Sequence, residues 1–363
     1  MSSNESENER YEMLVNGDIH KVIPRLAVPT IISMLITTIY NMADTFFVSQ
    51  LGTSASGAVG IIFSAMAIIQ ALSFTIGMGS GNYMARCLGA GRHEDGERAV
   101  SVAFFTGFLL GTCLGVFCLF HIDQVVMLLG ATETIKPYAV EYARYIFLAT
   151  PFMMCSFIMN NLLRLQGLAA FAMVGITAGG ILNIALDPIF IFGYCGEALS
   201  GTTGAAVATV IGQFCGAGMT LYFNTRKNPD IQISFKGFRP SAKAIGRIYT
   251  VGLPSIAMQC VGSLMTFGMN LILMAFSATA VAVFGVYFKL QSFVFLPIFG
   301  LNNGMVPIIS YNYGARRPNR VKKTIKLAVC YAEGIMLAGF CIFQFAPRQV
   351  LSIFAASDAM LAI

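Results

Sequence analysis

The chain is a succession of apolar segments, each long enough to cross a lipid bilayer as a helix of about twenty residues. We expect helices at 22–48, 57–84, 99–120, 138–160, 171–193, 204–223, 248–276, 280–308 and 327–346. Charged residues make up 11% of the composition, against about 25% in an average soluble domain. The sequence therefore predicts an all-α polytopic membrane protein.

The basic residues alternate between the two ends of the predicted helices. Of the 23 Lys and Arg residues, 19 lie before or at the start of the first helix or in the loops after the second, fourth, sixth and eighth. An excess of Lys and Arg marks cytoplasmic loops. We therefore expect a multi-pass protein of the plasma (inner) membrane with a cytoplasmic N-terminus, and we do not expect nucleic acid as a partner. The polar residues 1–20 lack the apolar stretch of a cleaved signal peptide.

Proline, glycine and arginine residues recur at a constant offset of 225. The pairs include Pro29 and Pro254, Gly60 and Gly285, Gly79 and Gly304, Gly89 and Gly314, and Arg92 and Arg317. The offset spans an even number of predicted helices, which gives parallel repeats around an axis along the membrane normal. We expect an N-terminal lobe of six transmembrane helices at 1–225. A partial C-terminal lobe, with about three to four helices, follows at 226–363.

Two predicted helices carry polar stripes although the segments are apolar. The first helix has Thr37, Asn41 and Asp44 on one face with Tyr40 beside them. The fifth, which contains GILNIALDPIFIFG, has Gly180, Asn183 and Asp187, and Gly180 is expected to let a neighbouring helix approach closely. At about 1.5 Å per residue, both Asp residues lie roughly 10–13 Å below the outer boundary. The two carboxyls and two carboxamides are therefore expected to share one pocket.

A carboxylate in hydrocarbon costs about 2.5–3.5 kcal/mol on insertion scales, so such a residue generally has a function. Two carboxyls with Asn oxygens can hold a proton or coordinate a small cation such as Na⁺, in which case Asp44, Asn183 and Asp187 are its ligands. Pro188 follows directly and removes a backbone hydrogen bond, so we expect it to act as a hinge. The alternative is that both Asp residues are packing polars bonded to hydroxyl groups.

Four stretches of the chain resemble the multidrug and toxic compound extrusion (MATE) family. They are LAVPTIISMLITTIYNMADTFFVSQLGT, ARCLGAGRHEDGERAV, LLRLQG and ILNIALDPIFIFG. The resemblance implies two six-helix lobes, the second incomplete in this chain, and antiport of organic cations or drugs against H⁺ or Na⁺. It also implies a first-lobe cation site at Asp44, Asn183 and Asp187, to which Thr209 is added by similarity. Some branches have a glutamate in the seventh helix, where this chain has Gln259 and Gly262.

We therefore expect a secondary antiporter that exports organic cations or drugs, acts as a monomer in the lipid bilayer and uses no cofactor. A lipid or lipid-linked-sugar flippase of the same architecture is the alternative, and it requires basic residues in the central cavity. Lys289 and Gln259 are the candidates for a cargo cavity. An enzyme is not expected, because no nucleophile–base pair, metal-ligand cluster or nucleotide-binding loop is evident. A channel is a further alternative, and it would be recognised by ion currents above transporter rates.

Overall fold

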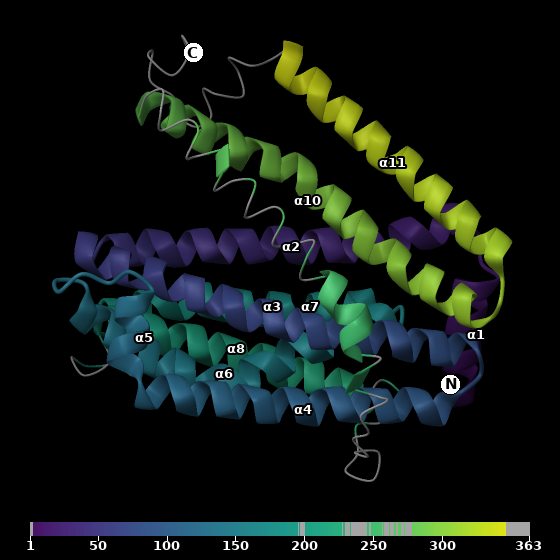
Figure 1. The fold of residues 1–363 in the computed structure, drawn as a ribbon, viewed down its shortest axis with the longest axis horizontal. Helices are drawn as coiled ribbons and strands as arrows, with labels where there is room; N and C mark the ends of the chain where they lie inside the picture. Colours follow the sequence, from purple (N-terminus) through teal and green to yellow (C-terminus); the bar gives the residue numbers. More distant parts are fainter. Residues whose placement is uncertain are drawn as a thin grey trace.

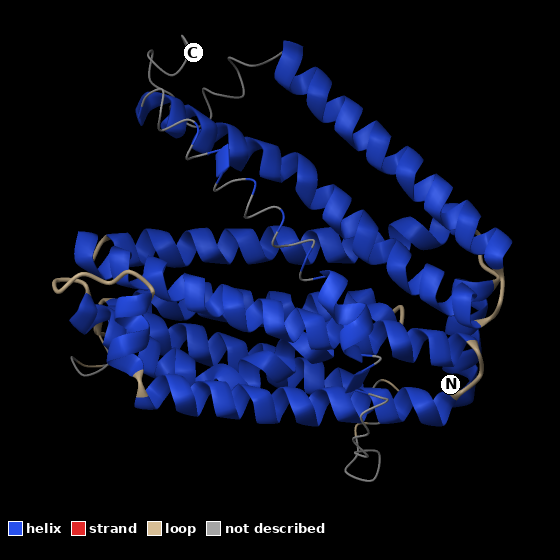
Figure 2. Ribbon diagram, in the orientation of Figure 1, coloured by secondary structure: helices blue, strands red, loops and turns tan. Residues whose placement is uncertain are grey.

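The computed structural model is a bundle of long helices, and no strand occurs in the residues that it describes (Figure 2). It describes residues 3–194, 196, 200–226, 228, 233, 245–246, 248–255, 257, 261, 265, 268–269, 272 and 278–345. The helices are α1 (Ser3–Val15), α2 (Ile19–Ser49), α3 (Thr53–Gly89), α4 (His93–Phe120), α5 (Ile122–Leu128), α6 (Lys136–Leu165), α7 (Ala169–Ile191), α8 (Gly201–Arg226), α10 (Ala278–Gly314) and α11 (Pro318–Phe345).

Eight of the helices in the described residues are long and apolar enough to cross a membrane. They are α2, α3, α4, α6, α7, α8, α10 and α11, and each corresponds to a segment expected from the sequence. The all-α membrane fold is therefore confirmed. The expected helix at 248–276 is described only in part, and its first residues, 248–255, are helical.

Two observed helices were not expected from the sequence. The first, α1, is polar and rich in glutamate, so it has helix-forming residues but no apolar periodicity to reveal it. It is followed by α2, whose N-terminus is capped by Asp18, because this carboxylate accepts a hydrogen bond from the His20 backbone at 3.2 Å. The second, α5, has only 7 residues, too few to show a period.

The helices α2 to α8 pack around α6, and α10 and α11 form a separate pair beside them. In this arrangement α6 packs against α3, α4 and α8, while α7 packs against α2 and α8. The most extensive contacts of α10 are with α2, α3 and α11, and smaller ones join it to α1 and α6. Figure 1 shows α10 and α11 against the bundle at the end where α1 lies, and diverging from α2 toward the opposite end.

The buried apolar side chains form two clusters that follow this division. The cluster near α1 joins Leu14, Leu26 and Leu88 to Ile308 and Tyr311 of α10. The cluster at the opposite end includes Ile62, Tyr142, Phe147 and Ile191, and none of its described members comes from α10 or α11. Burial therefore closes the end of the molecule that carries α1, and we call it the closed end.

The turns after α3 and α10 have matching backbone geometry. Gly91 has φ 72° and Arg316 has φ 56°, and these two positions are aligned by the sequence repeat. Both conformations are left-handed, which glycine adopts readily and arginine does not. The repeat found in the sequence thus extends to the backbone at these two turns.

Candidate functional site

Asp44 and Asp187 are the two carboxylates that are buried among the described side chains. Asp44 lies near the end of α2 and is 3% exposed, and Asp187 lies near the end of α7 and is fully buried. The two helices pack together, and the carboxyl groups are close enough to interact electrostatically. The structure thus brings together the two acids that the sequence singled out, at the end opposite α1.

Asn183 links this pair to α8. Its side-chain amide donates hydrogen bonds to Asp187 Oδ1 at 3.1 Å and to Thr209 Oγ1 at 3.5 Å. Both Asn183 and Thr209 are buried. Asp44, Asn183, Asp187 and Thr209 therefore form one polar cluster, in which three helices contribute side chains.

Two carboxylate oxygens of the cluster, Asp44 Oδ1 and Asp187 Oδ2, are buried and accept no hydrogen bond from any described residue. A buried acceptor without a donor costs free energy of about 1–3 kcal/mol, more when it is charged. A proton can bind to such an oxygen. A hard cation such as Na⁺ can also bind there, since carboxylate oxygens and the Thr209 hydroxyl oxygen are hard ligands. The described residues contain no cluster of three His, Cys, Asp or Glu side chains of the kind that holds a transition metal.

A small cavity of about 100 Å³ adjoins the cluster, and Asn183 and Thr209 are among the residues that line it. Tyr40 also lines it, and its ring lies against Gly180, where an added Cβ would come within 2.9 Å of Tyr40 Cδ1. The glycine thus allows α2 to approach α7 closely, and α2 is the neighbouring helix that the sequence left unnamed.

Asn41 and Tyr40, which were expected at the cation site, lie outside the polar cluster. Asn41 is only half-buried and takes no part in the hydrogen bonds of the cluster. Thr37 and Tyr40 line the adjoining cavity instead, so the face of α2 toward the cluster and the cavity carries Thr37, Tyr40 and Asp44.

Pro188 lies in the last turn of α7, because the helix ends at Ile191. The missing N–H therefore weakens the end of the helix and leaves its middle intact. The hinge stays a prediction.

The two candidates for a cargo cavity cannot be placed in this way. Gln259 lies outside the described residues. Lys289 belongs to α10, but its side chain lies outside the part that the structure describes.

Three polar residues near the cluster were missed in the sequence. Tyr142 of α6 is fully buried beside Asp44, Asp187 and Thr209. Gln70 of α3 and Gln213 of α8 line the adjoining cavity. Gln213 follows Thr209 by one helical turn, and this spacing of polar residues in an apolar helix was a usable signal. Tyr142 gave none, because tyrosine is also common at membrane interfaces.

Comparison with known proteins places the chain in a family. The profile of the MatE family matches residues 29–189 and again residues 254–363. The two matches begin at Pro29 and Pro254, which the sequence repeat aligns.

Curated and solved relatives agree with this match. The multidrug export protein MepA of Staphylococcus saprophyticus is 28% identical over 354 residues, which are 97% of this chain and 77% of that protein. A MOP superfamily transporter from Pyrococcus furiosus, whose binding pocket is described as reversed in polarity, is 31% identical with a TM-score of 0.85, over 96% of this chain and 76% of that one.

A multidrug resistance MATE family transporter solved in an outward-facing conformation is also 31% identical. Its TM-score is 0.85, and the alignment covers 96% of this chain and 77% of the other. With the family profile matched over most of the sequence and the helical fold shared, the chain belongs to the MatE family and is a multi-pass membrane transporter.

Proposed function

We propose that this protein is a multidrug efflux transporter that exports small organic cations in exchange for H⁺ or Na⁺, with Asp44 and Asp187 as the coupling site. The observation that carries the proposal is the pair of buried carboxylate oxygens, Asp44 Oδ1 and Asp187 Oδ2, which no described residue satisfies. The export activity of the MepA relatives supports the direction and the class of cargo.

Ion binding would act on the contact between α2 and α7. Two ionised carboxylates repel each other, and repulsion is strong where water is excluded. A proton or Na⁺ removes the repulsion, so α2 is drawn toward α7 along the contact of Tyr40 with Gly180. Release of the ion reverses this movement.

The same helix, α2, reaches the second half of the molecule. It packs against α7 on one side and against α10 on the other. A shift of α2 in response to the ion therefore changes the contact between the two halves, which is the step that alternating access requires. Under the expected topology the closed end is cytoplasmic, so the diverging end would admit the ion from outside.

Small organic cations are the proposed cargo because the described basic side chains gather at the closed end and in the loops. A lipid flippase is the alternative, and it would require basic side chains between the two halves at membrane depth. Binding of a lipid-linked phosphate without export of cationic dyes would favour the flippase.

The test is export of ethidium by the purified chain in proteoliposomes, with proton and sodium gradients imposed separately. We expect Asp44→Asn and Asp187→Asn each to reduce gradient-driven export to the level of empty vesicles. The matched control is Asp123→Asn, because Asp123 is exposed and pairs with Lys136 at 3.1 Å on the surface. Wild-type export by both Asn variants under each gradient would refute the coupling role.

A further inference from the structure

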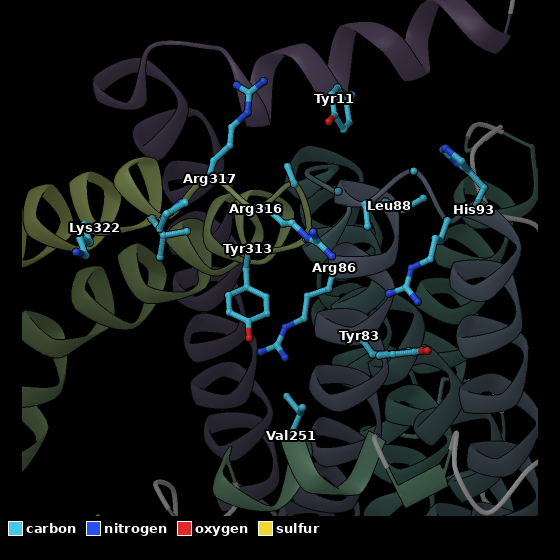
Figure 3. A pocket seen from close by; sticks show the side chains of 18 of the residues that line it. Tyr11, Tyr83, Arg86, Leu88, His93, Val251, Tyr313, Arg316, Arg317 and Lys322 are labelled. Carbon is cyan, nitrogen blue, oxygen red and sulfur yellow. The ribbon is translucent and has the colours of Figure 1, made fainter.

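A large basic cavity lies at the closed end, far along the helices from Asp44 and Asp187. Its volume is about 1770 Å³, and it is lined by α1, the α3–α4 turn and the α10–α11 turn (Figure 3). Among the described residues that line it there is no Asp or Glu. The basic residues in its lining are Arg86, Arg92, Arg316, Arg317 and Lys322.

Two of these five cations already have partners. Arg92 pairs with Asp95 at 3.4 Å. Arg317 donates to the Val15 carbonyl at 3.2 Å and to the side chain of Asn16, so it holds the end of α1. Figure 3 shows Arg317 extending toward α1, away from Arg86.

The other three cations are uncompensated. Within the described part of the chain, no carboxylate forms an ion pair with Arg86, Arg316 or Lys322. Arg86 lies over the Tyr313 ring at 4.8 Å, and its Nε is buried without a hydrogen-bond acceptor. A cation–π contact fixes a guanidinium without neutralising it, so its charge remains available to an anion.

Arg316 occupies a backbone position that does not favour it. Its φ of 56° is left-handed, whereas the equivalent position in the first half is Gly91. A side chain costs roughly 1 kcal/mol or more in that conformation. Glycine would adopt this backbone conformation at lower energy, so the presence of an arginine side chain at 316 requires a reason other than the backbone.

The cavity matches a phosphate group. Guanidinium groups recognise phosphate through paired N–H donors, and Arg86 and Arg316 line the same cavity from the two halves. The helices α4 and α11 begin at this cavity, so their N-terminal N–H groups add partial positive charge. The cavity also lies at the ends of membrane-spanning helices, where lipid headgroups are found.

We propose that this cavity binds the phosphate of an anionic phospholipid headgroup through Arg86 and Arg316. Residues of both halves contribute, because Arg86 lies in the last turn of α3 while Arg316 belongs to the α10–α11 turn. A bound phosphate bridges the two halves and stabilises the closed end. The site is independent of the coupling site proposed above.

The first experiment measures binding of dioctanoyl phosphatidylglycerol to the full chain in neutral detergent at fixed ionic strength. Dioctanoyl phosphatidylcholine and inorganic phosphate are the parallel probes. We expect phosphatidylglycerol to bind and phosphatidylcholine not to bind. Arg316→Gly should weaken phosphatidylglycerol binding about tenfold, since a charge-assisted contact is lost. Arg86→Gln combined with Arg316→Gly should abolish it.

The control variant distinguishes binding at this cavity from non-specific attraction of anionic lipid to basic side chains. Lys323→Gln is the matched control, because Lys323 is exposed on α11, is adjacent to Lys322 and does not line the cavity. Arg316→Gly installs the residue found at the equivalent turn, so the variant is expected to fold, and circular dichroism checks this.

Equal binding by wild type and by the Arg86→Gln/Arg316→Gly variant would overturn the proposal. An equal loss in Lys323→Gln would do so too. Binding of inorganic phosphate with the same dependence on Arg316 would support the phosphate site and overturn lipid as its source.

Discussion

The backbone of Gly314 in α10 lies directly against the carbonyl oxygen of Arg86 in α3, so that an added Cβ would come within 2.1 Å of this oxygen. The converse contact is also present, because a Cβ at Gly89 of α3 would come within 2.1 Å of the Tyr311 carbonyl oxygen of α10. The sequence repeat aligns Gly89 with Gly314 and Arg86 with Tyr311. The two contacts therefore exchange under the repeat, as expected for halves related by a two-fold axis.

This crossing explains why the closed end is closed. Glycine lets two helix backbones touch, which is the usual route to close helix packing in membranes. The Ser310 hydroxyl donates to Asn82 Oδ1 at 2.8 Å one turn away from the crossing, and it links the same two helices. The contact thus combines close packing with a buried hydrogen bond.

Adding a methyl group at either glycine should open this end. In Gly314→Ala or Gly89→Ala the new Cβ meets a backbone oxygen, which cannot move by changing rotamer. Overpacking of this kind costs about 1–3 kcal/mol. We expect a lower thermal unfolding temperature and faster amide hydrogen exchange in the α3–α4 and α10–α11 turns, measured by mass spectrometry.

The control for this prediction is Gly60→Ala on the same helix, α3. An added Cβ at Gly60 has no neighbour within 4 Å. Alanine is the better helix former by about 0.5–1 kcal/mol, so the control should be neutral or stabilising. If Gly314→Ala and Gly60→Ala behave alike, the crossing is not a constraint.

Replacing Asn183 should change the affinity for the coupling ion much more than replacing Asn41. Asn183 donates to Asp187 at 3.1 Å, whereas Asn41 lies outside the cluster. A hydrogen bond to a charged group contributes about 1.5–3 kcal/mol and here stabilises the ion-free carboxylate, so its loss should shift the ion affinity about tenfold or more. The measurement is the H⁺ or Na⁺ concentration that gives half-maximal dye export. Similar shifts in Asn183→Ala and Asn41→Ala would contradict the observed face of α2.

Gly180→Ala should disturb transport by separating α2 from α7. The added methyl would come within 2.9 Å of Tyr40 Cδ1, so the ring must move out of its place beside the small cavity. We expect dye export to fall several-fold at unchanged protein level. Gly218→Ala in α8 is the matched control, because a Cβ there meets nothing within 4 Å. Normal export by Gly180→Ala would mean that this contact is not part of the mechanism.

The anchoring of α1 can be tested separately from transport. Asn312 donates to the Leu14 carbonyl at 2.9 Å, and Arg317 donates to Val15, so both hold the end of α1 against α10 and α11. Arg317→Ala removes contacts worth about 1 kcal/mol each. We expect limited trypsin digestion to cut at Arg10 several times faster. Lys323→Ala, which removes an exposed cation nearby, should digest like wild type.

Much of the site was predictable because polar residues within apolar segments can be recognised from the sequence, and burying them in a membrane is costly. Asp44 and Asp187 interrupt apolar segments, and their helical spacing from Thr37 and Asn183 predicted the faces that meet. Asn41 has the spacing of that face, but it lies half-buried outside the cluster. Spacing gives the direction of a side chain around the helix axis, and it does not give which neighbour lies in that direction. Tyr142 was missed because its partners come from other helices.

The sequence by itself determined the approximate positions of eight membrane-spanning segments, the helical class, the repeat and the two buried acids. Each of these follows from local chemistry: the apolar length that a bilayer requires, the helical period and the desolvation of a carboxylate. The tertiary structure decided that Gly314 contacts Arg86, that α1 packs against α10 at one end, and that Arg86 and Arg316 line one cavity. Those relationships join residues more than two hundred positions apart, and only the packing of the helices brings them together.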